Sequence, residues 1–210
     1  NEKERRSSER GFKDGVWKTY FKSGQLEKEG NYKKDKREGL WKTYFKSGQL
    51  EKEGNYKEDK REGLWKYYHE NGQLEETSNY KNGKQEGAYK YYYQNGQLGT
   101  DASRKDDKLD GDIKSYYKNG QLMQELHYKD GEQEGKRKSY YENGQLRTEE
   151  TYEDGFQKGY RRTYYRNGQI ACEGVFNGKE EWGESSLIYY NEDGTLQEDQ
   201  SIEGHTNIEG

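Results

Sequence analysis

The sequence is poor in the residues that build a thick apolar core. Its 210 residues include no proline and one cysteine, and only 26% are hydrophobic while 37% are charged. Because ordinary globular domains contain roughly 45–50% apolar residues, a large aliphatic interior is excluded. No run of about 18 apolar residues is present, which excludes an apolar transmembrane helix. The chain must therefore bury other side chains if it folds at all.

Residues that commonly form metal and catalytic sites are also scarce. Cys172 is the only cysteine, which excludes an intramolecular disulfide and a multi-cysteine metal site. The histidines, His69, His127 and His205, have no ligand-like spacing. No G-x-S-x-G, Walker, H-E-x-x-H or dinucleotide-binding motif is present. We therefore expect a non-enzymatic protein with no catalytic residue, no metal and no cofactor.

What the sequence does contain is aromatic residues in a strict repeat. It has 22 tyrosines, 5 phenylalanines and 4 tryptophans, which argue against disorder. One set of glycines recurs every 24 residues: Gly15, Gly39, Gly63, Gly87, Gly111, Gly135, Gly159 and Gly183. A second set follows the same interval from Gly24 to Gly168, and its last member, Gly194, comes two residues late. The chain is therefore predicted to be an array of eight copies.

Each copy reads as two strands joined by tight turns. Asn-Gly between aromatic and apolar runs, as at Asn71-Gly72, is a strong hairpin signal, and Ser23-Gly24 occupies the same place. We predict type I′ turns there, with positive φ at both central residues, and return turns at sites such as Asp130-Gly131. The predicted fold is all-β: an elongated, twisted antiparallel β-meander of about eight 24-residue β-hairpin repeats.

The turn position sets a predicted register. The expected cross-strand pairs are Trp17–Gly30, Thr19–Lys28 and Phe21–Leu26 on one side of the sheet, and Lys18–Glu29 and Tyr20–Glu27 on the other. Each tryptophan is expected to cover the glycine opposite it. In stacked copies these positions become ladders, and contacts between neighbouring copies are what stabilise a repeat array.

The repeats define the expected domain organisation. We assign residues 1–10 to a polar N-terminal linker, 11–204 to the array with a degenerate last copy, and 205–210 to a C-terminal tail. Charge is uneven, because residues 1–105 carry a net +6 and residues 106–210 a net −10. Residues 181–210 contain no lysine or arginine. That acidic end is either a solubilising cap on the last copy or a patch for a basic partner.

The repeat signature, G-x-W-K-x-Y-x-x-N-G-Q-L followed by E, Y-K and E-G, resembles the MORN repeat. The closest resemblance is to the bacterial variant found in YwqK-type antitoxins. It covers about residues 11–204 and rests on Gly39, Trp41, Tyr44, Gly48, Leu50 and Tyr56 and their equivalents. The resemblance implies β-hairpins in an extended sheet, and a scaffold, membrane-binding or toxin-neutralising role. Departures from the pattern occur at Arg104, Arg137, Arg161 and Ser185.

Two functions remain open from the sequence, with a third behind them. The first is a protein-binding scaffold, including an antitoxin that neutralises a partner protein. The second is peripheral association with anionic lipid through the basic N-terminal half. The third is an exported structural array attached to a surface. Nucleic acid is disfavoured because nearby glutamates balance the lysines. We expect a cytoplasmic protein, with an exported, processed or lipid-anchored precursor as the alternative.

One ladder is the predicted partner-binding row. It begins with aromatics and ends with arginines: Trp17, Trp41, Trp65, Tyr89, then Arg137 and Arg161. Tryptophan, tyrosine and arginine are the residues that dominate binding energy at protein interfaces. Two arginines in the row indicate a face that is partly open to solvent. The alternative is that the aromatics of the row simply form the packed part of the sheet.

Overall fold

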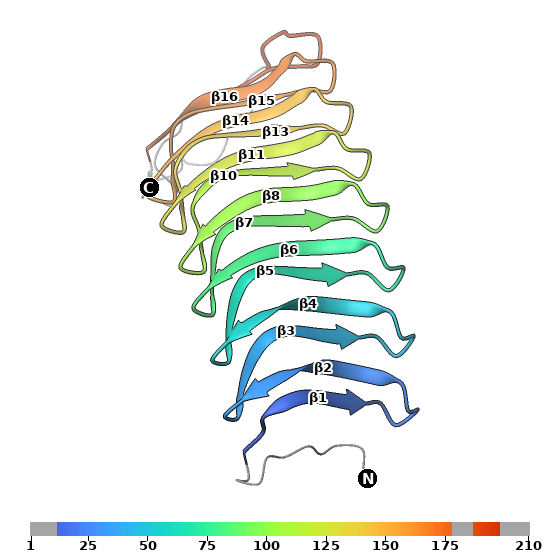
Figure 1. Cartoon of the computed structure of the whole chain (residues 1–210). Helices are drawn as coiled ribbons and strands as arrows, with labels where there is room; N and C mark the ends of the chain where they lie inside the picture. The colour runs from blue at the N-terminus through green and yellow to red at the C-terminus, as the bar shows by residue number, and fades with distance from the viewer. Residues whose placement is uncertain (1–11, 178–186, 198–210) are drawn as a thin grey trace, which may run out of the picture.

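The computed structural model describes residues 12–177 and 187–197, which form a single open β-sheet (Figure 1). The sheet contains 17 strands, and the described residues include no helix. Every pairing is antiparallel. The predicted all-β meander of hairpin repeats is therefore confirmed. The predicted linker 1–10, the tail 205–210 and most of the acidic end lie outside the described residues.

The strands follow the repeat. Their bounds are β1 Gly15–Tyr20, β2 Leu26–Lys33, β3 Lys36–Tyr44, β4 Leu50–Lys57, β5 Lys60–Tyr68, β6 Leu74–Lys81, β7 Lys84–Tyr92, β8 Leu98–Lys105, β9 Lys108–Leu109, β10 Gly111–Tyr116, β11 Leu122–Lys129, β12 Glu132–Gln133, β13 Gly135–Tyr140, β14 Leu146–Glu153, β15 Phe156–Tyr164, β16 Ile170–Asn177 and β17 Ile188–Tyr189. Strands adjacent in the chain pair with each other, except β9 with β10 and β12 with β13. The short strands β9 and β12 pair with β8 and β11, which also pair with β10 and β13.

The hairpin-tip turns differ from the prediction, whereas the return turns lie where the sequence predicted them. At the hairpin tip, Gly24 N donates to Phe21 O and Phe21 N donates to Gln25 O, and only Gly24 has positive φ. This is a three-residue loop, a type I turn followed by a glycine in the left-handed region. The type I′ turns are instead the return turns, such as Asn82-Gly83 with φ of 53° and 91°. The predicted type I′ turn at the Asn-Gly and Ser-Gly tips is therefore wrong.

The longer tip loop moves one ladder to the other side of the sheet. Trp17–Gly30, Lys18–Glu29 and Thr19–Lys28 pair as predicted, but the register then shifts and Tyr20 lies across from Leu26. The predicted pairs Phe21–Leu26 and Tyr20–Glu27 are wrong for this reason. Directly opposed residues share a side, so the leucine ladder lies on the side of Tyr20 and not on that of Trp17.

The tryptophan rings join neighbouring repeats. Trp41 pairs in register with Gly54 of its own hairpin, but its ring covers Gly30 of the preceding one. A Cβ placed at Gly30 would lie 2.6 Å from Trp41 Cγ. Trp41 Nε1 also donates to Asn31 O at 3.1 Å. The ring therefore occupies the space that glycine leaves and satisfies its own N–H on the neighbouring repeat.

Burial is concentrated on the side of the sheet that carries the tryptophans. The buried apolar residues are Trp65, Tyr80, Ala102 and Ile113, with exposed fractions of 2–9%. We call this side the aromatic face, defined by Trp17, Trp41, Trp65, Tyr89, Ile113, Arg137 and Arg161. The other side, defined by Tyr20, Tyr44, Tyr68, Tyr140, Tyr164 and the glutamates that they contact, is the tyrosine–glutamate face.

Candidate interaction surface

The first part of the aromatic face is an unbroken row of edge-to-face rings. The ring centroids are 5.5 Å apart in Trp17–Tyr32, 5.0 Å in Tyr32–Trp41, 6.1 Å in Trp41–Tyr56 and 4.9 Å in Tyr56–Trp65, and 6.2 Å in Trp65–Tyr80. Their interplanar angles run from 72° to 87°. This geometry places the positive ring edge of one side chain against the negative face of the next, which favours aromatic contact beyond simple area burial.

Basic side chains cover this row. Arg37 lies 3.8 Å from the Tyr56 ring centroid, and Lys13 lies 4.4 Å from that of Trp17. Arg61 lies 4.7 Å from the Trp65 centroid. Cations over aromatic rings are attracted to the π-electrons while keeping part of their hydration. The accessible surface of the row is therefore mixed, with cationic groups above aromatic rings.

Arg61 is fully engaged within the fold. It donates to the hydroxyl groups of Tyr67 and Tyr80, both at 2.9 Å. Burial, followed by the hydrogen bond with Tyr80, raises the pKa of Tyr67 well above its usual range. Nearby, burial and the adjacent Glu75 raise the pKa of the Glu76 carboxyl. This cluster lies within a single hairpin repeat, formed by β5 and β6.

The row changes chemistry towards the C-terminal end. Ile113 is 6% exposed and replaces the aromatic ring with an aliphatic side chain. One repeat later, Glu150 is 8% exposed and lies between Arg137 and Arg161. The Arg137 Nη1 to Glu150 Oε2 distance is 3.5 Å, and Arg161 Nε lies 3.4 Å from Glu150 Oε1. Two arginines thus flank one buried carboxylate where the earlier repeats place indole over glycine.

The six side chains of the predicted binding row differ widely in how much of their surface is exposed to solvent. Trp65 is 2% exposed, which leaves little of its ring for a partner, whereas Trp17, Trp41 and Tyr89 are half-buried. The side chains of Arg137 and Arg161 are 35% and 36% exposed. All six lie on one face, but the arginines are separated from the aromatics by Ile113. Partner binding by this row remains a prediction.

The tyrosine–glutamate face is held by hydrogen bonds between repeats. Tyr44 OH donates to Glu29 at 2.6 Å, and Tyr68 OH donates to Glu53 at 3.0 Å. The hydrogen bond from Tyr44 is the main cause of the lowered pKa of Glu29. Burial, followed by the hydrogen bond to its glutamate, raises the pKa of each of these tyrosines to about 12. The same contact recurs in Tyr140–Glu125 and Tyr164–Glu149.

Lysine–glutamate pairs cross the strands on this face, as the sequence predicted. The nitrogen–oxygen distances are 3.2 Å in Lys18–Glu29, 3.4 Å in Lys114–Glu125 and 3.3 Å in Lys138–Glu149. The lysine side chains are 39–50% exposed. Such solvent-exposed pairs contribute about 0–1 kcal/mol each. They are a solvated ladder rather than a paired-carboxylate catalytic site.

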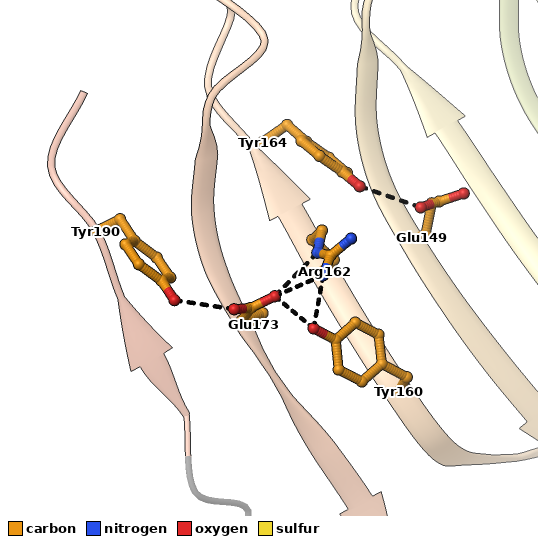
Figure 2. A network of polar contacts seen from close by, with 6 residues as sticks. All are labelled: Glu149, Tyr160, Arg162, Tyr164, Glu173 and Tyr190. Carbon is orange, nitrogen blue, oxygen red and sulfur yellow. Dashed lines mark hydrogen bonds and ion pairs between the residues drawn. The ribbon is translucent and has the colours of Figure 1, made fainter. Parts of the chain in front are cut away.

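The densest polar network lies at the C-terminal end of this face and centres on Glu173 (Figure 2). Arg162 contacts Glu173 Oε2 through Nε at 3.0 Å and Nη2 at 2.7 Å, while Tyr190 OH donates to Oε1 at 2.9 Å. Tyr160 OH also donates to this carboxylate. These bonds, that of Tyr160 first, lower the pKa of Glu173 to about 2. The carboxylate thereby connects β15 and β16 with Tyr190, which directly follows β17.

Sequence reasoning missed a further set of contacts between repeats at the hairpin tips. Tyr93 OH donates to Tyr116 O at 2.7 Å, and Asn95 Nδ2 donates to Lys118 O at 2.9 Å. Tyr117 and Tyr141 repeat the first contact one and two copies later. The signal was present as a 24-residue recurrence, but the direction of the hydroxyl group depends on the stacking of the repeats.

Other kinds of site are absent from the part of the chain that the structure describes. No group of three or more His, Cys, Asp or Glu side chains there could hold a metal ion. Cys172 is half-buried, and burial raises the pKa of its thiol. None of the described segments forms a helix long and apolar enough to cross a membrane.

Comparison with known families identifies the repeat. The MORN repeat variant matches residues 13–34, 37–58, 61–82, 85–98, 109–130, 133–154 and 157–177. No curated protein matches the chain. The seven matched segments follow the strand pairs described above and together cover well over half of the sequence. The chain therefore belongs to the MORN repeat variant family.

Proposed function

We propose that this chain is a non-catalytic protein-binding scaffold and that the partner docks on its aromatic face. The observation that carries the proposal is the row of half-exposed Trp, Tyr and Arg side chains along that face. These residue types supply most of the binding energy at protein interfaces. MORN repeats commonly bind proteins or membranes, so a non-catalytic binding role fits the family. Neutralisation of a toxin is one form that this role would take.

The aromatic face supports this role better than the opposite face does. On the tyrosine–glutamate face, hydroxyl groups and carboxylates satisfy one another, and lysines pair with glutamates. On the aromatic face, Trp17, Trp41 and Tyr89 keep part of their rings accessible. Ordered aromatic rings lose little conformational entropy when a partner covers them, so they are good anchors.

The test compares one bulky substitution on each face. The purified products of the neighbouring genes are titrated at micromolar concentration against the chain and two variants. Thr43→Arg adds a long side chain on the aromatic face, two residues from Trp41, and Asn55→Arg adds the same group on the other face. We expect Thr43→Arg to weaken binding at least tenfold and Asn55→Arg to change it less than twofold.

Two results would overturn the proposal. One is the absence of a protein partner at micromolar concentration together with co-sedimentation of the chain with anionic vesicles. The other is partner binding that Asn55→Arg weakens as much as Thr43→Arg does. Growth rescue on co-expression with the bound partner distinguishes toxin neutralisation from simple scaffolding. Partner binding without any growth rescue would argue against the antitoxin form alone.

A further inference from the structure

The arginines of the aromatic face differ in how far the fold satisfies their N–H groups. Arg61 donates to two tyrosine hydroxyls. By contrast, Arg137 Nε and Arg161 Nε are buried and make no hydrogen bond, although Arg161 Nε lies 3.4 Å from Glu150 Oε1 in an ion pair. Buried polar groups are almost always paired, so an unpaired one asks for an explanation. Because these Nε atoms are covered by the fold, a partner reaches only the exposed third of each arginine side chain.

The unpaired atoms are all of one kind. Among the described residues, the buried side-chain atoms without a hydrogen-bond partner are N–H donors in every case: Trp17 Nε1, Arg104 Nε, Gln133 Nε2, Arg137 Nε, Gln157 Nε2 and Arg161 Nε. Gln157 lies directly across from Tyr152 on β14, and Tyr152 OH donates to Glu150 at 3.1 Å. Two of these buried donors, Arg137 Nε and Arg161 Nε, belong to the arginines that pair with Glu150.

Charge at this position is also unbalanced. Among the described residues, Glu150 is the one carboxylate that pairs with Arg137 and Arg161, so the cluster carries a net +1. The buried carboxylate fixes one side of each guanidinium, and about a third of each arginine side chain remains exposed. Arg161 is further held 5.7 Å from the ring centroid of Phe176. A fixed guanidinium loses less entropy on binding an anion than a free one does.

We propose that Arg137 and Arg161, held by Glu150, form a binding site for a carboxylate of an acidic segment in a protein partner. The inference rests on the proposed scaffold role and names the chemistry of its partner. A guanidinium matches a carboxylate through two parallel N–H···O bonds, and such charge-assisted bonds are about twice as strong as neutral ones. A carboxylate neutralises the extra positive charge.

The net negative charge of the C-terminal half does not prevent this binding. At physiological salt the Debye length is about 8 Å, so exposed charges farther away are largely screened. The arginine pair exceeds Glu150, the carboxylate that it shares, by one positive charge. The local balance therefore favours an acidic segment over a basic one.

The test uses a fluorescein-labelled peptide of ten glutamates and measures its anisotropy with the full chain. The double variant Arg137→Gln/Arg161→Gln removes the site, and we expect it to weaken binding about tenfold or more, since a hydrogen bond to a charged group contributes about 1.5–3 kcal/mol. The matched control is Arg147→Gln/Arg166→Gln. It also removes two arginines, which both lie over the Tyr141 ring, and it should change binding less than twofold.

A third variant separates loss of the binding site from loss of the fold. Removal of both arginines leaves Glu150 buried without a counter-charge, which is destabilising. The triple variant Arg137→Gln/Arg161→Gln/Glu150→Gln removes that charge as well, and circular dichroism checks that it folds. Weakened peptide binding in the folded triple variant supports the site. Peptide binding equal to that of the unchanged chain would overturn it.

Further binding measurements distinguish an acidic protein segment from phosphate and from anionic lipid as the ligand. A ten-lysine peptide should not bind. If 10 mM inorganic phosphate displaces the glutamate peptide completely, or if anionic vesicles but not the peptide bind through the two arginines, the proposal of an acidic protein segment is wrong. If a protein partner binds the aromatic face but ignores Arg137→Gln/Arg161→Gln, this inference fails while the scaffold role stands. If no partner binds at all, the scaffold role fails first.

Discussion

Gly54→Ala should destabilise the array through a single methyl group. A Cβ at this position would lie 2.5 Å from Trp65 Cγ, whereas carbon atoms in contact are normally about 3.5–4.0 Å apart. The φ of Gly54 is not positive, so alanine causes no backbone strain there. Trp65 is 2% exposed and lies between the rings of Tyr56 and Tyr80, so it cannot move away freely.

The expected loss of stability follows from the packing and the hydrogen bond that the indole ring of Trp65 loses. Overpacking of a well-packed site costs about 1–3 kcal/mol. A shift of the indole also weakens the hydrogen bond from Trp65 Nε1 to Asn55 O, now 3.1 Å long, which contributes about 1 kcal/mol. We expect Gly54→Ala to lower the free energy of unfolding by about 2–4 kcal/mol, measured by urea titration followed by circular dichroism.

A double-mutant cycle separates the clash from other effects. In the next repeat, Ser78 carries a Cβ and lies across from the smaller ring of Tyr89. Trp65→Tyr should therefore recover about 1 kcal/mol or more of the loss caused by Gly54→Ala. Gly63→Ala is the control, since it strains a φ of 70° but meets nothing within 4 Å. Additive effects of Gly54→Ala and Trp65→Tyr, or a loss under about 0.5 kcal/mol, would refute the reasoning.

Three further predictions concern the contacts between repeats. Tyr93→Phe removes the hydrogen bond to Tyr116 O and should cost about 1 kcal/mol of unfolding free energy; an unchanged urea midpoint would contradict that role. Ser47→Asn supplies the amide that Asn71, Asn95 and Asn119 use to reach the next turn, so it should raise stability by about 0.5–1 kcal/mol in the same assay. The pKa of Glu173 falls from 4.5 to about 2 on folding, so its contribution to stability is complete above about pH 4.5 and is lost as the pH falls towards 2. Melting temperatures of Glu173→Gln and the unchanged chain should converge across that interval, and parallel curves would exclude the effect.

Periodicity alone determined much of this protein. The 24-residue spacing of Gly15 and its equivalents predicted hairpin repeats, and the Lys18–Glu29 pair followed from strand alternation. These features are local, because alternation and turn residues act over a few positions. The MORN resemblance rested on the same recurring residues and is confirmed by the family match.

The tertiary structure decided which side chains each repeat brings into contact, for three physical reasons. The tip loop holds three residues rather than two, and that one residue moved Leu26 to the side of Tyr20. Rings are larger than the spacing between strands, so Trp41 covers the glycine of the preceding repeat rather than the one in its own register. The sequence placed Arg137 and Arg161 in the aromatic ladder, at positions where the repeat pattern has an aromatic residue. Arg137 lies across from Glu150 in its own hairpin, and only stacking of the repeats brings Arg161 to the same buried carboxylate.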